Sequence, residues 1–303
     1  MMIMSSSARH TTQLTPLNFF ILIGVIVAWG ANFVMVKLGL EQIQPLTLCT
    51  LRFLLTSIPA IFFVPIPKKV WTQVISYGIL TFALQFTLIF AAIASGVSPG
   101  IAALICQVQV FFSIFFACVF AKQSVSMWQI VGALIAFSGI GLIILHNSID
   151  TNYIGIICLI GASLSWGLGN LISIKLHDIN ILSLVVWSSF IAFFPLAILA
   201  FVFETPLQTI QHADQLSATT FIAVAYIAYI STHFGYGCWA WLLNRHSTAT
   251  IAPFALLCPI VAFIASASVF QETFNAWKIA ATLLVMIGLS INLFSSRFIC
   301  QKN

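Results

Sequence analysis

Residues 29–37 read WGANFVMVK, an apolar stretch that is interrupted by the amide of Asn32 and ends in the cation Lys37. A related stretch, WGLGNLISIK, occupies residues 166–175. An unsatisfied amide is unfavourable in lipid, so an asparagine within roughly twenty apolar residues is expected to face another helix or a wet cavity. The recurrence of this pattern indicates a duplicated membrane protein with polar groups inside its membrane spans.

The composition excludes a soluble domain, because 61% of the 303 residues are hydrophobic and only 6% are charged. One helical crossing of a bilayer needs roughly 20 apolar residues. Ten stretches of suitable length are predicted to cross: 17–37, 46–66, 71–93, 99–121, 127–146, 153–174, 181–203, 219–242, 250–270 and 277–296.

The two halves of the chain correspond to each other. Trp29, Asn32 and Lys37 have counterparts about 138 residues later. Because each unit holds five helices, an odd number, the second unit must cross the membrane in the opposite sense, which is the arrangement of many transporters. We therefore predict an all-α integral membrane protein with ten transmembrane helices in two inverted five-helix repeats, at 17–146 and 153–296, between tails at 1–16 and 297–303. The counterparts are Trp166, Asn170 and Lys175.

The net charge of +5 reports orientation. With the N-terminus in the cytoplasm, eight of the cations fall on the inner side and only Lys37 and Lys278 on the outer side. This bias follows the positive-inside rule and predicts that both termini are cytoplasmic. It also explains the positive charge without a nucleic-acid partner, so none is expected. The inner cations are Arg9, Lys68, Lys69, Lys122, Lys175, Arg245, Arg297 and Lys302.

Polar side chains are predicted to form two layers within the membrane. Asn32 and Arg52 lie about 7.5 and 9 Å below the outer edge, at 1.5 Å per helical residue, and Gln85 falls in the same outer third. Asn170 and Trp187 fall in the inner third. A guanidinium at this depth suits a carboxylate, although it could instead extend to the interface. The amides could equally hold helices together by hydrogen bonds.

Further candidates lie near mid-membrane. Gln107 and Gln109 are two residues apart, about 200° around a helix, so both are not expected to face one cavity. Tyr236 lies between two glycines, and aromatic residues such as this and Trp166 could also serve packing. The predicted substrate-binding residues are Asn32, Arg52, Gln85, Gln107, Trp166, Asn170, Trp187 and Tyr236.

Several motifs together resemble the EamA branch of the drug/metabolite transporters over nearly the whole chain. They are WGANF at 29–33, LRF at 51–53, QVQVFFS at 107–113, SWGLGN at 165–170, VWS at 186–188, GYGCW at 235–239 and PFALLCPIV at 253–261. The resemblance implies ten helices in two inverted repeats. It also implies export of small amino-acid-like metabolites of the O-acetylserine and cysteine class.

The acidic residues depart from the pattern of that family. The family often has a glutamate after the fourth and ninth helices, and this chain has Glu272 after the ninth but Gln123 after the fourth. The apolar stretches contain no aspartate or glutamate, so an intramembrane carboxylate for proton coupling is not expected. The seven cysteines are scattered without a CxxC pair, so neither a metal site nor a cofactor is expected.

The function expected from these patterns is secondary transport by alternating access, with a small-molecule substrate and the lipid bilayer as partners. Uptake by the same fold and a structural membrane subunit are alternatives. A membrane enzyme, such as a lipid-linked transferase, would need clustered acidic residues, whereas those here are dispersed among loops. No catalytic residue is therefore predicted. The sequence does not indicate the oligomeric state, and a monomer is compatible with it.

Overall fold

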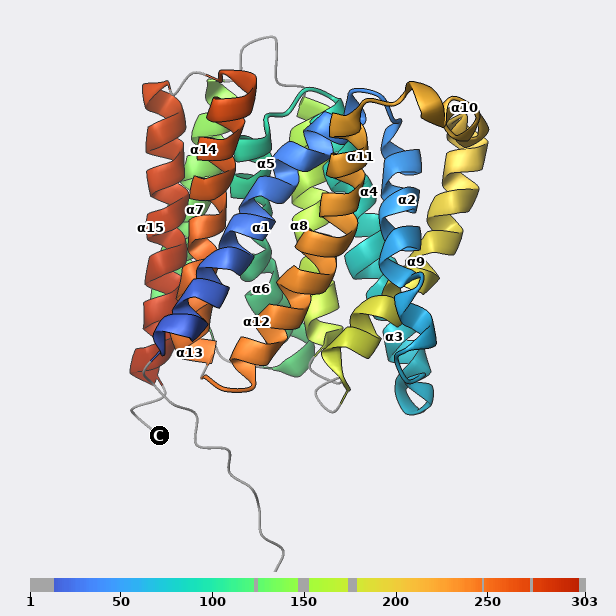
Figure 1. The fold of residues 1–303 in the computed structure, drawn as a ribbon. Coiled ribbons are helices and arrows are strands. Elements are labelled where there is room, and N and C mark those ends of the chain that lie inside the picture. The colour runs from blue at the N-terminus through green and yellow to red at the C-terminus, as the bar shows by residue number, and fades with distance from the viewer. Residues whose placement is uncertain are drawn as a thin grey trace, which may run out of the picture.

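The computed structural model describes residues 14–122, 125–146, 153–173, 179–246, 248–272 and 275–299. Within these ranges the protein is a bundle of helices without a strand (Figure 1). Ten helical segments in the described part are long and apolar enough to cross a membrane. The predicted all-α fold with ten membrane spans is thus confirmed. Most of the two predicted tails, together with Gln123 and Lys175, lies outside the described residues.

The first half contributes five candidate spans, and the second, third and fourth of them contain an interruption in the regular helix. The spans are Pro16–Leu40 (α1), Pro45–Phe62 (α2 at Pro45–Ser57), Lys68–Ala94 (α3 at Trp71–Tyr77 and α4 at Gln85–Ala94), Pro99–Phe120 (α5 at Pro99–Cys106 and α6 at Gln109–Ala121) and Met127–Leu145 (α7).

The second half contributes the other five, with short helices α10 (Pro206–Gln211) and α13 (Thr248–Ile251) between them. The spans are Tyr153–Ser173 (α8), Ile181–Phe203 (α9), Ala218–Leu243 (α11 at Ala218–Ala225 and α12 at Gly235–Leu243), Ala252–Phe270 (α14 at Cys258–Phe270) and Ala276–Phe294 within α15 (Ala276–Ile299).

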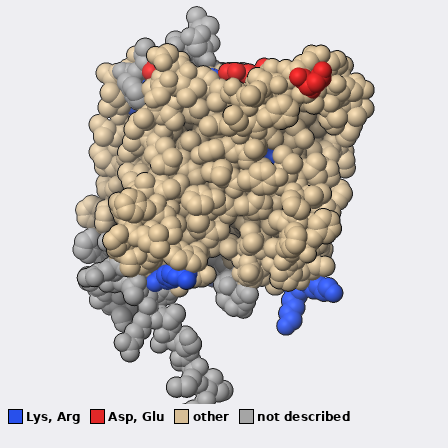
Figure 2. Space-filling view, viewed as in Figure 1, with Lys and Arg blue, Asp and Glu red and all other residues tan. Residues whose placement is uncertain are grey.

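The two ends of the bundle differ in charge. Figure 2 shows the largest lysine and arginine areas at the lower edge of the molecule and the aspartate and glutamate at the upper edge, with a belt between them that is almost free of charge. We call the lower end, where α6 and α12 finish, the basic end, and the upper end, where α1 and α9 finish, the acidic end (Figure 1). The basic end carries Lys68, Lys69, Lys122 and Arg245, and the acidic end carries Glu41, Glu204, Asp214 and Glu272.

Local sequence sets where the helices begin. Thr15 caps α1 by accepting a hydrogen bond from the backbone N–H of Asn18, and Pro16 follows it as the first helical residue. Ser98 caps α5 in the same way, ahead of Pro99. A capping hydroxyl satisfies one of the N–H groups that the first turn leaves unpaired, and proline has no N–H to satisfy there.

Irregular backbone recurs at corresponding places in the two halves. The third and eighth spans contain π-helical segments, at Gly78–Leu84 and Tyr226–Phe234. The fourth and ninth spans end at Lys122 and Gln271, which both have a left-handed φ of 53°. In addition, α1 begins at the basic end whereas α8 begins at the acidic end (Figure 1). The inverted repeat stays a prediction, and these paired features favour it.

Helices α7 and α15 pack side by side at one flank of the bundle (Figure 1). Gly132 allows the close approach, because a β-carbon there would lie 2.6 Å from the carbonyl oxygen of Gly288. Small residues let helices in membranes approach closely and gain van der Waals contact. Neither helix lines the cavity described next, so this pair supports the bundle from outside the cavity.

Candidate functional site: a cavity between the two halves

A cavity of about 1190 Å³ lies inside the bundle and is walled by residues from both halves of the chain. It reaches the basic end, because Asn180 at the start of α9 and Asn244 at the end of α12 belong to its wall. The turns at the acidic end contribute no lining residue among those described. Seven of the eight predicted site residues are on the wall: Asn32, Arg52, Gln85, Gln107, Trp166, Asn170 and Tyr236.

Arg52 is held in the deep part of this cavity by neutral partners. Its side chain is 1% exposed, its Nη1 donates to Oδ1 of Asn32 at 3.1 Å, and its Nη2 donates to Oγ1 of Thr232 at 3.1 Å. Its Nε has no hydrogen-bond partner, and no carboxylate in the described part of the chain pairs with it. A buried cation without an anion is costly by several kcal/mol, which makes Arg52 a ready site for an anionic ligand.

Two local features keep the guanidinium in place. Its Cζ lies 4.1 Å from the centroid of the Phe86 ring, where the negative face of the aromatic ring attracts a cation. Thr232 lies in the second π-helical segment and donates its hydroxyl to the carbonyl of Ile227, five residues earlier. The wider turn thus orients Oγ1 of Thr232 to accept from Arg52.

An aromatic wall lies beside Arg52. The ring centroids of Trp29 and Tyr236 are 5.6 Å apart, and those of Trp29 and Trp239 are 5.1 Å apart. The indole N–H of Trp29 donates to the carbonyl oxygen of Ser231 at 3.1 Å. The predicted site omitted Trp29 and Trp239, although the correspondence between Trp29 and Trp166 was the signal that could have included the first.

The glutamines on the wall differ in their bonding. Gln107 donates its Nε2 to the carbonyl of Ala255 at 3.1 Å, whereas Oε1 of Gln85 is buried and has no partner in the described structure. Gln109 also lines the cavity, so the expectation that Gln107 and Gln109 could not share it was wrong. The reason is that the helix is interrupted between α5 and α6, at 107–108, so the regular rotation of 100° per residue does not apply.

Asn170 forms a second, uncharged polar cluster. Its Nδ2 donates to Oε1 of Gln109 and to Oγ of Ser113, both at 3.0 Å, and its Oδ1 accepts from the indole N–H of Trp166 at 3.1 Å. All the polar atoms of the Asn170 amide therefore have protein partners. This cluster joins α8 to α6 and adds polar wall without adding charge.

Trp187 is placed away from the cavity wall. Its ring packs against Trp71 at 5.5 Å and Phe190 at 6.0 Å between centroids. The predicted depth in the membrane did not include the direction in which the side chain points, and depth alone cannot distinguish a cavity residue from one that packs between helices.

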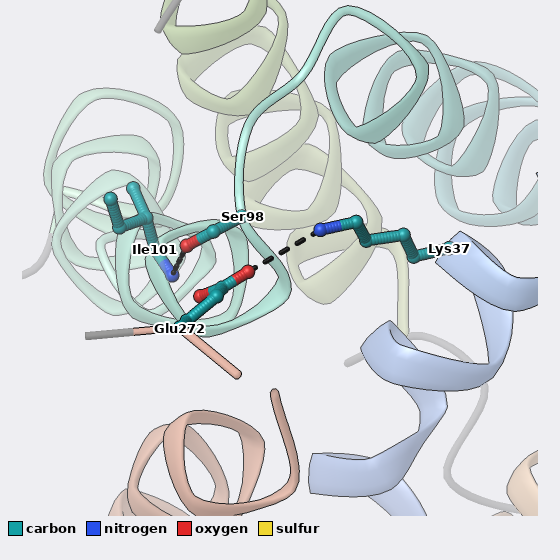
Figure 3. A network of polar contacts seen from close by, with 4 residues as sticks. All are labelled: Lys37, Ser98, Ile101 and Glu272. Carbon is teal, nitrogen blue, oxygen red and sulfur yellow. Dashed lines mark hydrogen bonds and ion pairs between the residues drawn. The ribbon is translucent and has the colours of Figure 1, made fainter. Parts of the chain in front are cut away.

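Side chains of the two halves contact each other at the acidic end. Nζ of Lys37, at the end of α1, lies 3.4 Å from Oε1 of Glu272 and 4.0 Å from the centroid of Phe270. Figure 3 shows this ion pair beside Ser98, at the start of α5. The carboxylate of Glu204 accepts hydrogen bonds from the backbone N–H groups of residues 46 and 47, at 2.8 and 2.7 Å. An anion at the start of α2 is favourable for the helix dipole.

The described residues contain no group of three or more histidine, cysteine or acidic side chains that could hold a metal ion. A large cavity between the helices of both halves, with a few polar side chains on a mostly apolar wall, is the usual architecture of a membrane transporter for solutes. The fold and the cavity therefore indicate a membrane transporter.

Comparison with known proteins identifies the family. The EamA-like transporter family matches residues 17–145 and again 153–294. A protein of Salmonella typhimurium named "Probable amino-acid metabolite efflux pump" is 34% identical over 285 residues, covering 92% of this chain and 95% of the relative. A protein of Escherichia coli with the same name is 33% identical over 281 residues, covering 90% and 94%.

A solved structure titled "Crystal structure of protein" shares the fold, with a TM-score of 0.63 and 13% identity over 94% of this chain and 99% of the other. The chain belongs to the EamA-like transporter family. It is a multi-pass membrane protein that transports small metabolites.

Proposed function

We propose that this protein exports small, carboxylate-bearing, amino-acid-like metabolites across the bacterial inner membrane by alternating access. The O-acetylserine and cysteine class is the proposed cargo. The observation that carries the proposal is Arg52, a buried cation on the cavity wall with neutral partners only. The names of the two relatives as probable amino-acid metabolite efflux pumps support the direction and the class of cargo.

The orientation follows from the charge of the two ends. The positive-inside rule favours a cytoplasmic position for the basic end, which carries Lys68, Lys69, Lys122 and Arg245, and both termini are proposed to lie on the same side. The cavity reaches this end, so a metabolite enters it from the cytoplasm, as an exporter requires. The contacts of Lys37 and Glu204 close the other end, and alternating access requires them to open once in each cycle.

The chemistry of Arg52 selects a carboxylate. Guanidinium and carboxylate form paired, charge-assisted hydrogen bonds that are about twice as strong as neutral ones. Asn32 and Thr232 occupy one N–H on each terminal nitrogen, which leaves Nε–H and the remaining N–H groups for a ligand. The aromatic wall of Trp29, Tyr236 and Trp239 then contacts the apolar part of the cargo.

Arg52→Gln tests the proposal in proteoliposomes loaded with radiolabelled cysteine. Transport is expected to fall at least about 30-fold, because losing one partner of a buried charge pair costs about 2 kcal/mol or more. Arg52→Lys keeps the charge but not the paired hydrogen-bond geometry. Its transport rate is expected to lie between those of the wild type and Arg52→Gln. Melting temperature and membrane insertion of each variant report whether the fold is kept.

Arg245→Gln is the matched control, because Arg245 is exposed at the basic end, stacks on Trp241 at 3.9 Å and does not line the cavity. It is expected to transport at the wild-type rate. Transport by a folded Arg52→Gln variant at the rate of this control would overturn the proposal. Comparing vesicles of both orientations separates export from uptake.

A further inference from the structure

Two residues that line the cavity each carry a buried polar atom without a partner among the described residues: Nε of Arg52 and Oε1 of Gln85. Both side chains are 1% exposed. Neighbouring wall amides are bonded, since Gln107 donates to Ala255 and Asn170 has three partners. Buried polar groups are nearly always satisfied, so an unpaired donor and an unpaired acceptor in one cavity point to a ligand that carries the complementary groups.

The two atoms belong to neighbouring parts of the wall. The guanidinium of Arg52 lies over the ring of Phe86, which is the residue after Gln85. The donor Nε–H matches a carboxylate oxygen, and the acceptor Oε1 matches an N–H group. An α-amino acid carries both groups on one carbon atom.

We propose that Gln85 recognises the amino nitrogen of the cargo, with Oε1 accepting an N–H hydrogen bond while Arg52 binds the carboxylate. This inference rests on the proposed function, because it assumes that Arg52 binds a carboxylate. No aspartate or glutamate lines the cavity in the described part of the chain, so the nitrogen is recognised as a hydrogen-bond donor and not as a positive charge. The substrate class therefore includes N-acylated amino acids, which keep one N–H, and a cavity of about 1190 Å³ has room for the acyl group.

Three simple thiols distinguish recognition of the carboxylate from recognition of the nitrogen. Cysteine has an ammonium group, N-acetylcysteine has a neutral amide N–H, and 3-mercaptopropanoate has the carboxylate and thiol without nitrogen. Each is titrated, in the presence of a reductant, as a competitor of radiolabelled cysteine binding to the purified full-length protein. In the wild type, the affinity for N-acetylcysteine is expected to lie within about fivefold of that for cysteine. The affinity for 3-mercaptopropanoate is expected to be about tenfold lower than that for cysteine, because one hydrogen bond to a buried group is lost.

Gln85→Met removes the acceptor at nearly constant volume. It is expected to weaken cysteine binding about tenfold, to the level of 3-mercaptopropanoate, while 3-mercaptopropanoate itself changes by less than about twofold. The matched control is Gln73→Met, the same substitution in the same span at a position that does not line the cavity, and it is expected to leave all three affinities unchanged.

Equal weakening of cysteine and 3-mercaptopropanoate in Gln85→Met would overturn the inference, as would equal binding of these two ligands by the wild type, a comparison that needs no variant. Binding of cysteine without N-acetylcysteine would overturn the statement that charge is not recognised. The proposed function would be refuted instead if none of the three carboxylates competed with labelled cysteine, or if their competition were the same in the wild type and in Arg52→Gln.

Discussion

Asn32 and Asn170 occupy corresponding places in the two halves of the chain, yet they lie in different electrostatic surroundings. Asn32 accepts a hydrogen bond from the buried cation Arg52. Asn170 is bonded to the neutral side chains of Gln109, Ser113 and Trp166. The two amides thus have similar positions along their helices but different chemical tasks.

This difference teaches that the duplicated pattern determines position, while the neighbouring helices determine function. Arg52 comes from α2, and the corresponding α9 places the carboxylate of Glu204 near its end but no cation on the cavity wall among the described residues. The charged binding groups are therefore expected to be concentrated near Asn32. The cluster around Asn170 is expected to contribute mainly to holding α8 against α6.

The substitution Asn32→Asp should give the largest effect. The new carboxylate would lie where Oδ1 now accepts from Arg52 at 3.1 Å and would occupy the guanidinium that the cargo needs. Transport of cysteine is expected to fall at least about 30-fold, while the melting temperature stays equal or rises, because a buried cation gains a charged partner. Transport assays and thermal unfolding of the same preparation check both parts. Loss of transport together with a lower melting temperature would contradict this reasoning.

The same substitution at Asn170 should give an intermediate effect of a different kind. Asn170→Asp removes the N–H donors to Gln109 and Ser113, at about 0.5–1.5 kcal/mol each. The melting temperature is expected to fall by about 2–6 °C, and transport by less than about tenfold. If the two aspartate variants behaved alike in both assays, the distinction between a binding cluster and a structural cluster would be lost.

The ion pair at the acidic end should give the smallest effect. Lys37 and Glu272 are partly exposed, so their pair is worth about 0.2–1 kcal/mol, which is at most about a fivefold change in the population open at that end. Cys106 lines the cavity and can report this opening in a variant without the other cysteines. Lys37→Gln is expected to raise the rate at which an impermeant maleimide labels Cys106 from the acidic side. The double reversal, Lys37→Glu with Glu272→Lys, is expected to restore slow labelling. Equal rates in all three proteins would exclude a closing role.

The membrane spans were predictable because ten apolar stretches of suitable length are direct physical requirements of the bilayer. That Arg52 and Asn32 lie close together was predictable in a similar way, since a constant rise per residue places both side chains in one layer. Their hydrogen bond agrees with that placement.

The direction of a side chain was less predictable, because it depends on rotation about the helix axis. Trp187 was predicted to line the site from its depth alone, but it packs against Trp71 and is not on the cavity wall. Gln109 reaches the cavity only because the helix is interrupted beside it. Thr232 was not a candidate, since its contact with Arg52 depends on a π-helical segment that no residue type reveals. Interruptions in helices, rather than their lengths, limited what the sequence could predict about the site.

The two π-helical segments have a consequence for how the chain tolerates changes in length. A π turn contains about one residue more than an α turn, so each segment accommodates the equivalent of a single-residue insertion without breaking its helix. Gln85 is the first residue after the first segment, and Tyr236 is the second residue after the other. Deleting one residue there would rotate everything downstream by about 100° and turn both side chains away from the cavity. The orientation of two candidate binding residues toward the cavity therefore depends on one wide turn in each half.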